Sequence, residues 1–156
     1  SLASALPRLV DHSGDLEARG EALYGAWLCG AVLGGSFDLP HAQTHAIVLP
    51  HVLAFNAPFA ADMVTALAGV FGEGDPWTAL RNLQTSLPMP LSLGELGFDK
   101  ADIAEVTRQV TANPYHNPRH IDGTEIDALL ERAWAGLPPR PSADSGFETV
   151  IAKEYS

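Results

Sequence analysis

Hydrophobic residues recur at intervals of three and four along most of this chain, and this periodicity is the strongest constraint on its fold. No stretch alternates apolar and polar residues over five positions, so strand signals are nearly absent. The pattern predicts an all-α fold, a helical bundle. The chain has 156 residues, of which 46% are apolar. Because single domains cluster near ~100–150 residues, we expect one hydrophobic core and one domain.

Caps and prolines divide this pattern into separate helices. The expected helices cover residues 15–33, a histidine-containing segment behind Pro40, a segment with Pro58 in its first turn that runs to Phe71, a segment opened by Asp75 and Pro76, one capped by Asp99 and Asp102, and one started by Thr124 and Asp127. Pro50 is expected to kink or split the histidine-containing helix, because proline lacks a backbone N–H. One further helical turn is expected near Ser92.

The charge balance excludes several classes of partner. Nineteen acidic residues stand against nine basic ones, and the formal net charge is −10. Such a chain repels phosphate backbones and anionic lipid surfaces, so we expect neither nucleic acid nor a membrane as partner. The lone Cys29 excludes an internal disulfide and a cysteine-rich zinc site within the chain, which fits a cytoplasmic protein. No apolar run approaches the ~20 residues of a membrane span.

Three histidines punctuate the apolar segment at residues 37–56. His41 and His45 lie four residues apart, so on a helix both imidazoles project from one face, the spacing used by paired metal ligands. A metal needs a third ligand, and Asp38 is the nearest candidate carboxylate. The alternative is that one imidazole bonds within the helix and the others lie on the surface. For His51, a surface or loop-bracing position is expected.

A second polar feature is NPYHNPRHID, residues 113–122. Its two Asn-Pro steps favour a rigid loop that presents Tyr115, His116, Arg119 and His120 in fixed directions. Arg119 has the fork geometry to hold a substrate carboxylate, and Tyr115 can donate a proton. The alternative is a structural connector that stops one helix and orients the next, with His116 and His120 at surface or loop-bracing positions.

Three segments together resemble a known family. ALYGAWLCG, GGSFDLPHAQTHAIVLPHVLAFN and ANPYHNPRHID are similar, in the same order, to the C-terminal helical domain of the maleylacetate reductases, which belong to the iron-containing (group III) alcohol dehydrogenases. The resemblance implies a domain over residues 1–139, followed by a linker and short tail over 140–156. It also implies NADH- or NADPH-dependent reduction of maleylacetate to 3-oxoadipate in aromatic-compound degradation, usually by a dimer.

The resemblance assigns roles to five residues. It implies that His45 and Tyr115 are catalytic, and that His41, Asn113 and Arg119 bind the small dicarboxylate substrate. His41 also matches a position that binds metal in metal-dependent relatives, where the metal is iron or zinc. The family holds NADH or NADPH on an N-terminal domain, so this chain alone is not expected to bind the cofactor.

One departure from the family has a large consequence. The family carries an HxxxH pair fourteen and ten residues before the position of His41, where this chain has Trp27 and Ala31. A histidine-containing segment is therefore expected to be deleted, and the faces it covered would cost several kcal/mol at ~25 cal/mol per Å² if exposed. Rearrangement, a homo-oligomer or a cofactor-domain partner is expected. The resulting prediction is a substrate-side half enzyme, inactive alone; the alternative is a degenerate domain used for association and fused to another enzyme.

Overall fold

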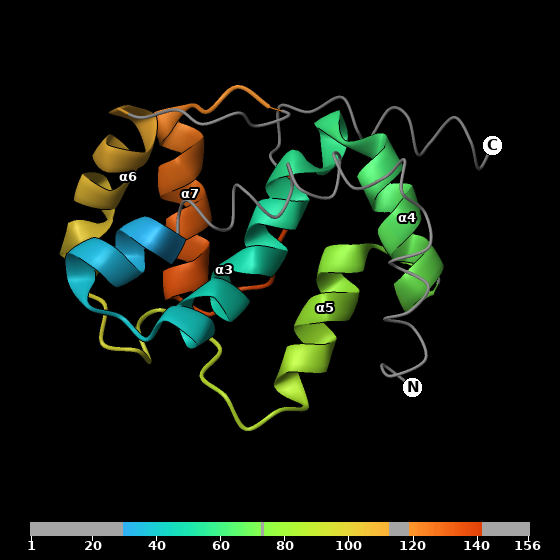
Figure 1. The fold of residues 1–156 in the computed structure, drawn as a ribbon, viewed down its shortest axis with the longest axis horizontal. Coiled ribbons are helices and arrows are strands. Elements are labelled where there is room, and N and C mark those ends of the chain that lie inside the picture. The colour runs from blue at the N-terminus through green and yellow to red at the C-terminus, as the bar shows by residue number, and fades with distance from the viewer. Residues whose placement is uncertain (1–29, 73, 113–118, 142–156) are drawn as a thin grey trace.

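The computed structural model describes residues 30–72, 74–112 and 119–141, and within these ranges it contains helices and no strand (Figure 1). The all-α prediction is confirmed. Residues 30–37 are helical and are followed by α3 (His41–Asn56), the 3-10 turn η2 (Ala57–Phe59), α4 (Ala61–Phe71), α5 (Pro76–Thr85), the 3-10 turn η3 (Lys100–Asp102), α6 (Ile103–Ala112) and α7 (Gly123–Trp134). None of the described helices is long and apolar enough to cross a membrane.

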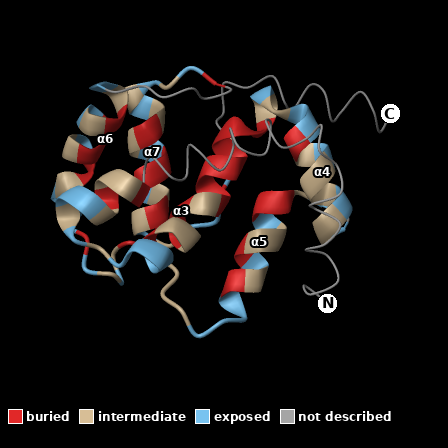
Figure 2. Cartoon of the chain, viewed as in Figure 1, coloured by how far each residue is buried: buried red, intermediate tan, exposed pale blue. Residues whose placement is uncertain are grey.

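Helix α3 is the centre of the described structure. It packs against both α5 and α7, while α6 pairs with α7 and α4 pairs with α5 (Figure 1). Figure 2 shows that buried positions run almost continuously along the second half of α3, whereas the other helices bury one face. This follows from its apolar sequence, because a helix that is hydrophobic all round must be covered on every side. The histidine-containing segment is thus the core helix.

Pro50 lies inside α3, and the helix is continuous through it, so the expected split does not occur. Proline at position 50 cannot donate to the carbonyl of Ala46, four residues earlier. The Nε2 amide of Gln84, a buried side chain of α5, donates a hydrogen bond to that same carbonyl. A neighbouring helix therefore supplies the donor that the proline removes.

This compensation makes the cost of losing Gln84 depend on Pro50. Gln84→Met is expected to lower the free energy of unfolding by about 1–3 kcal/mol, because the Ala46 carbonyl then lacks a donor. In a Pro50→Ala background the restored N–H at position 50 serves that carbonyl, so Gln84→Met is expected to cost less. Urea unfolding of all four proteins measures the coupling. Equal costs in the two backgrounds would contradict the arrangement.

Of two expected helix starts, one is confirmed and one is displaced. Asp75 caps α5 as predicted, with Oδ1 accepting from the backbone N–H of Thr78 at 2.8 Å. The cap of α7 is Asp122 instead of Thr124, because its side chain accepts from the N–H groups of Thr124 and Glu125. Asp127 instead accepts a hydrogen bond from Thr107, which ties α7 to α6.

Two further boundaries also differ from the prediction. The helix expected to end near Leu33 continues to Phe37 and ends where Asp38 adopts a positive φ of 54°. Two glycines inside it do not stop it, since its apolar side chains join the core. Pro58 lies in the η2 turn, and α4 begins only at Ala61. Both differences reflect packing that local propensity does not contain.

The proline-rich connector between α5 and η3 is held against the end of α7. The expected turn at Ser92 is present as a hydrogen-bonded turn, with the Glu95 N–H donating to Ser92 Oγ at 3.1 Å. Buried Arg81 of α5 donates to the carbonyls of Leu91 and Gly136, at 2.8 and 3.0 Å. One side chain thus joins α5, the connector and the end of α7.

Candidate functional site

The predicted histidine pair lies in the first turns of α3. The rings of His41 and His45 are 4.2 Å apart between centroids and inclined by 47°. His41 is exposed and His45 is half-buried. Burial lowers the pKa of His45, and the neighbouring His41 lowers it further. The pair therefore projects from one helix face, as its four-residue spacing predicts, with the inner imidazole favoured in its neutral form.

The inner imidazole lies directly against the backbone of the preceding helix. A Cβ added at Gly30 would be 2.3 Å from Nε2 of His45, a distance that no real side chain tolerates. Position 30 therefore has to be glycine for the His45 ring to occupy this place. A Cβ at Gly34 would lie 3.5 Å from Nδ1 of His41, which is an ordinary contact. Gly30 and Gly34 thus lie against the rings of His45 and His41, respectively.

The described residues do not form a metal site by themselves. Within residues 30–72, 74–112 and 119–141 there is no group of three or more His, Cys, Asp or Glu side chains placed to hold an ion. Asp38, the candidate third ligand, is therefore not placed to complete a metal site with His41 and His45. Nε2 of His45 is buried without a hydrogen-bond partner and faces the Gly30 backbone, not an open coordination position. The pair fits a metal only with ligands from elsewhere.

Arg119 is an internal residue in this structure. Its guanidinium forms an ion pair with Glu125 and donates to the backbone carbonyl of Phe55 at 3.2 Å. It also lies over the rings of Phe55 and Phe59, 4.4 and 5.3 Å from their centroids. The side chain is 7% exposed. It thus ties the segment before α7 to the end of α3.

Of the other predicted loop residues, the structure describes only His120. Asn113, Tyr115 and His116 lie outside the described residues. His120 is exposed, as expected. The structure therefore brings His41 and His45 together and places Arg119 apart from them, in the contact between α3 and α7. The roles proposed for these side chains remain predictions.

The surface or loop-bracing position expected for His51 is wrong. The side chain is 2% exposed, and its Nε2 has no hydrogen-bond partner. Burial, together with the positive charges of Arg81 and Arg132, lowers its pKa to about 3. The available signal was its position four residues before Phe55 and four after Ile47, which places it on the buried face of α3.

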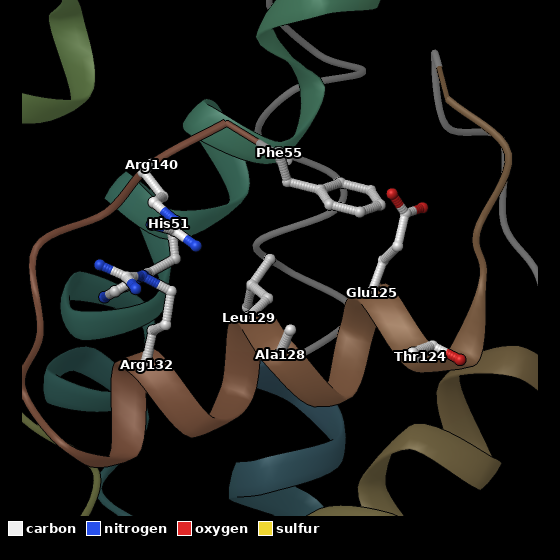
Figure 3. Close-up of a pocket in the computed structure, with 8 residues that line it drawn as sticks. All are labelled: His51, Phe55, Thr124, Glu125, Ala128, Leu129, Arg132 and Arg140. Carbon is white, nitrogen blue, oxygen red and sulfur yellow. The ribbon is translucent and has the colours of Figure 1, made fainter. Parts of the chain in front are cut away.

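A cavity of about 250 Å³ lies beside His51, between α3 and α7 (Figure 3). Its lining residues are His51, Phe55, Thr124, Glu125, Ala128, Leu129, Arg132 and Arg140. Cavities that bury drug-sized ligands measure about 300–1,000 Å³. A nicotinamide dinucleotide is too large for this cavity, so no described residue here is assigned to hold that cofactor.

The chain is similar to named proteins over most of its length. The model of the Fe-containing alcohol dehydrogenase family, C-terminal, matches residues 1–134. A maleylacetate reductase from Sphingobium indicum is 44% identical over 154 aligned residues, which cover 89% of this chain and 44% of that protein. A maleylacetate reductase from Pseudomonas knackmussii is 42% identical over 86% of this chain and 43% of its own length.

A solved structure agrees with the sequence comparisons. The crystal structure of maleylacetate reductase from Agrobacterium tumefaciens superposes with a TM-score of 0.69 at 39% identity, covering 73% of this chain and 32% of that one. The chain thus spans less than half the length of these relatives. The chain belongs to the Fe-containing alcohol dehydrogenase family, whose C-terminal domain it carries.

Proposed function

We propose that this chain is the substrate-side helical domain of an NADH- or NADPH-dependent reductase that converts maleylacetate to 3-oxoadipate in the cytoplasm. The observation that carries the proposal is the 44% identity to the maleylacetate reductase of Sphingobium indicum across 89% of this chain. The proposed domain covers residues 1–139, with 140–156 as linker and tail. Because the chain spans 44% of that relative, the proposed reaction needs a cofactor-binding domain as well.

The histidine pair supports a role in proton transfer. Reduction adds a hydride and a proton to the substrate, and the bound nicotinamide supplies the hydride. The lowered pKa of His45 favours a neutral imidazole, which is able to take up a proton and return it during a reaction. We assign proton relay to His45, together with Tyr115, and contact with the dicarboxylate to His41, Asn113 and Arg119.

The test is fusion to a cofactor domain. The 156-residue chain alone is expected not to oxidise NADH in the presence of maleylacetate. Fused to the cofactor-binding half of the Sphingobium reductase, it is expected to do so. In that fusion His45→Asn is expected to lower kcat by about 10²–10⁴-fold, the usual contribution of a positioned proton-transfer group. Loss of NADH absorbance measures each rate.

The controls separate the possible outcomes. His120→Asn makes the same chemical change at an exposed position and should leave kcat unchanged. Turnover by the isolated chain would refute the half-enzyme proposal. A folded fusion without activity would favour the alternative, a degenerate domain used for association.

One observation favours that alternative enough to keep it. Within the described ranges, α4 buries only Met63, and the neighbouring Phe59 is 56% exposed. Apolar side chains left at a surface are typical of a contact with a partner. Light scattering on the purified chain tests this, because a monodisperse monomer at high concentration would leave self-association without support.

A further inference from the structure

The cavity between α3 and α7 has a cationic end. Arg132 and Arg140 line it, and Figure 3 shows their guanidinium groups on the same side of the cavity as His51. Arg132 donates from Nε and Nη2 to the carbonyl of Pro138, which fixes the direction of its side chain. One N–H-bearing nitrogen of that guanidinium, Nη1, is left for another acceptor. Two cationic side chains thus lie at the same end of the cavity.

No acidic side chain in the described part of the chain neutralises this end. Among the described residues, ion pairs join Lys100 to Glu131, Arg108 to Glu105 and Arg119 to Glu125, and none includes Arg132 or Arg140. Burial lowers the pKa of Arg132, and the like charge of Arg140 lowers it further. Two neighbouring guanidinium groups without a carboxylate, in a chain of net charge −10, are arranged for an anion from outside the described residues.

His51, at the same end of the cavity, has a polar atom without a hydrogen-bond partner. Its side chain is 2% exposed, and its Nε2 has no partner. Buried polar atoms in proteins are nearly always hydrogen-bonded, so an orphaned nitrogen that lines a cavity indicates a missing ligand or solvent partner. A neutral imidazole can donate from Nε2 to a carboxylate oxygen.

The other lining residues indicate what kind of molecule would bear the anionic group. The middle of the cavity is lined by Phe55, Ala128 and Leu129, which offer an apolar surface. Glu125 lies at the end opposite the arginines (Figure 3). A second carboxylate on the ligand would meet this acidic side chain. Only a small molecule fits a volume of about 250 Å³.

We propose that this cavity binds a small organic monocarboxylate with an apolar or aromatic body. The carboxylate contacts Arg132, Arg140 and His51, and the body packs on Phe55 and Leu129. No residue that the family resemblance assigns to substrate handling lines this cavity. The site therefore goes beyond the proposed reductase function and can be tested without turnover.

Benzoate is the probe, titrated into the purified 156-residue chain at low ionic strength and followed by calorimetry or NMR. Saturable one-site binding is expected, with a Kd on the order of 1 mM for a ligand of this size. Arg140→Gln and Arg132→Gln are each expected to weaken binding by about tenfold or more, because each removes a charge-assisted hydrogen bond. Arg140 is exposed, so its variant remains interpretable even if Arg132→Gln fails to fold.

Matched ligands and a matched variant complete the test. Benzamide, which keeps the ring and loses the charge, is expected to bind at least tenfold more weakly. Terephthalate, which adds a carboxylate opposite the first, is also expected to bind more weakly than benzoate. Arg108→Gln removes one positive charge from an exposed site on α6 and should leave the Kd unchanged. The proposal is overturned if benzoate does not saturate, or if Arg140→Gln binds it as tightly as the unaltered chain.

Discussion

Replacing Arg119 with methionine is expected to lower the free energy of unfolding by about 3–5 kcal/mol, the usual cost of breaking a buried ion pair from one side. The substitution removes the cation that pairs with Glu125 and the donor to the Phe55 carbonyl. It also removes the cation over the Phe55 ring. Since whole domains are stable by only about 5–15 kcal/mol, the effect is large. Denaturant unfolding measures it.

A second variant separates charge from packing. Arg119→Met combined with Glu125→Leu removes both ends of the ion pair, and it is expected to be more stable than Arg119→Met alone. Arg108→Met, at an exposed ion pair on α6, serves as control and should have little effect. If Arg119→Met is as stable as the unaltered chain, the internal role of Arg119 is wrong and its predicted contact with substrate gains support.

Acidification is expected to destabilise the fold through His51. Its pKa is about 3 in the folded chain, against an ordinary value of 6.5. Above pH 6.5 the imidazole is neutral in both states and contributes no pH dependence. As the pH falls from 6.5 toward 3, only the unfolded chain takes up the proton, so stability falls by about 1.4 kcal/mol per pH unit from this group. The full loss is on the order of 5 kcal/mol.

The comparison that isolates this effect uses two substitutions. His51→Phe and His51→Leu both remove the titratable group, and the adjoining cavity gives the larger ring some room. Relative to either variant, the unaltered chain should lose stability between about pH 6.5 and about pH 4. Urea unfolding across this range measures the difference. A difference independent of pH would show that His51 is not held in its neutral form.

The two candidate sites share α3. The histidine pair lies at the start of this helix, whereas His51 and Phe55 line the cavity in its second half. Because α3 is covered by α5 and α7, both sites depend on the same packing. The Ala46 carbonyl, which Pro50 leaves without its usual helical donor, lies between them along the helix and accepts a hydrogen bond from Gln84. Loss of that single hydrogen bond is therefore expected to disturb the part of α3 that connects the two sites.

Much of the fold was accessible from local sequence. Helical spacing and the near absence of strand patterns predict the all-α class, and the Asp75-Pro76 pair predicts the start of α5. The four-residue spacing of His41 and His45 predicts that their rings project from one face of the helix, where they lie 4.2 Å apart between centroids. These features depend on hydrogen bonds and side-chain directions within a few residues, which the chain encodes directly.

Other features depend on partners far away in the chain. The continuity of α3 through Pro50 requires a donor from α5, and that donor, Gln84, lies thirty-eight residues after Ala46. The burial of His51 requires α7 across the cavity, and the place of Arg119 requires Phe55 and Glu125. A local sequence pattern does not predict which distant side chain donates to a backbone carbonyl that lacks its helical donor, or which carboxylate pairs with a buried cation. The sequence by itself determined the helices and the histidine pair; only tertiary packing decided which polar groups are buried, because burial sets both their partners and their charge.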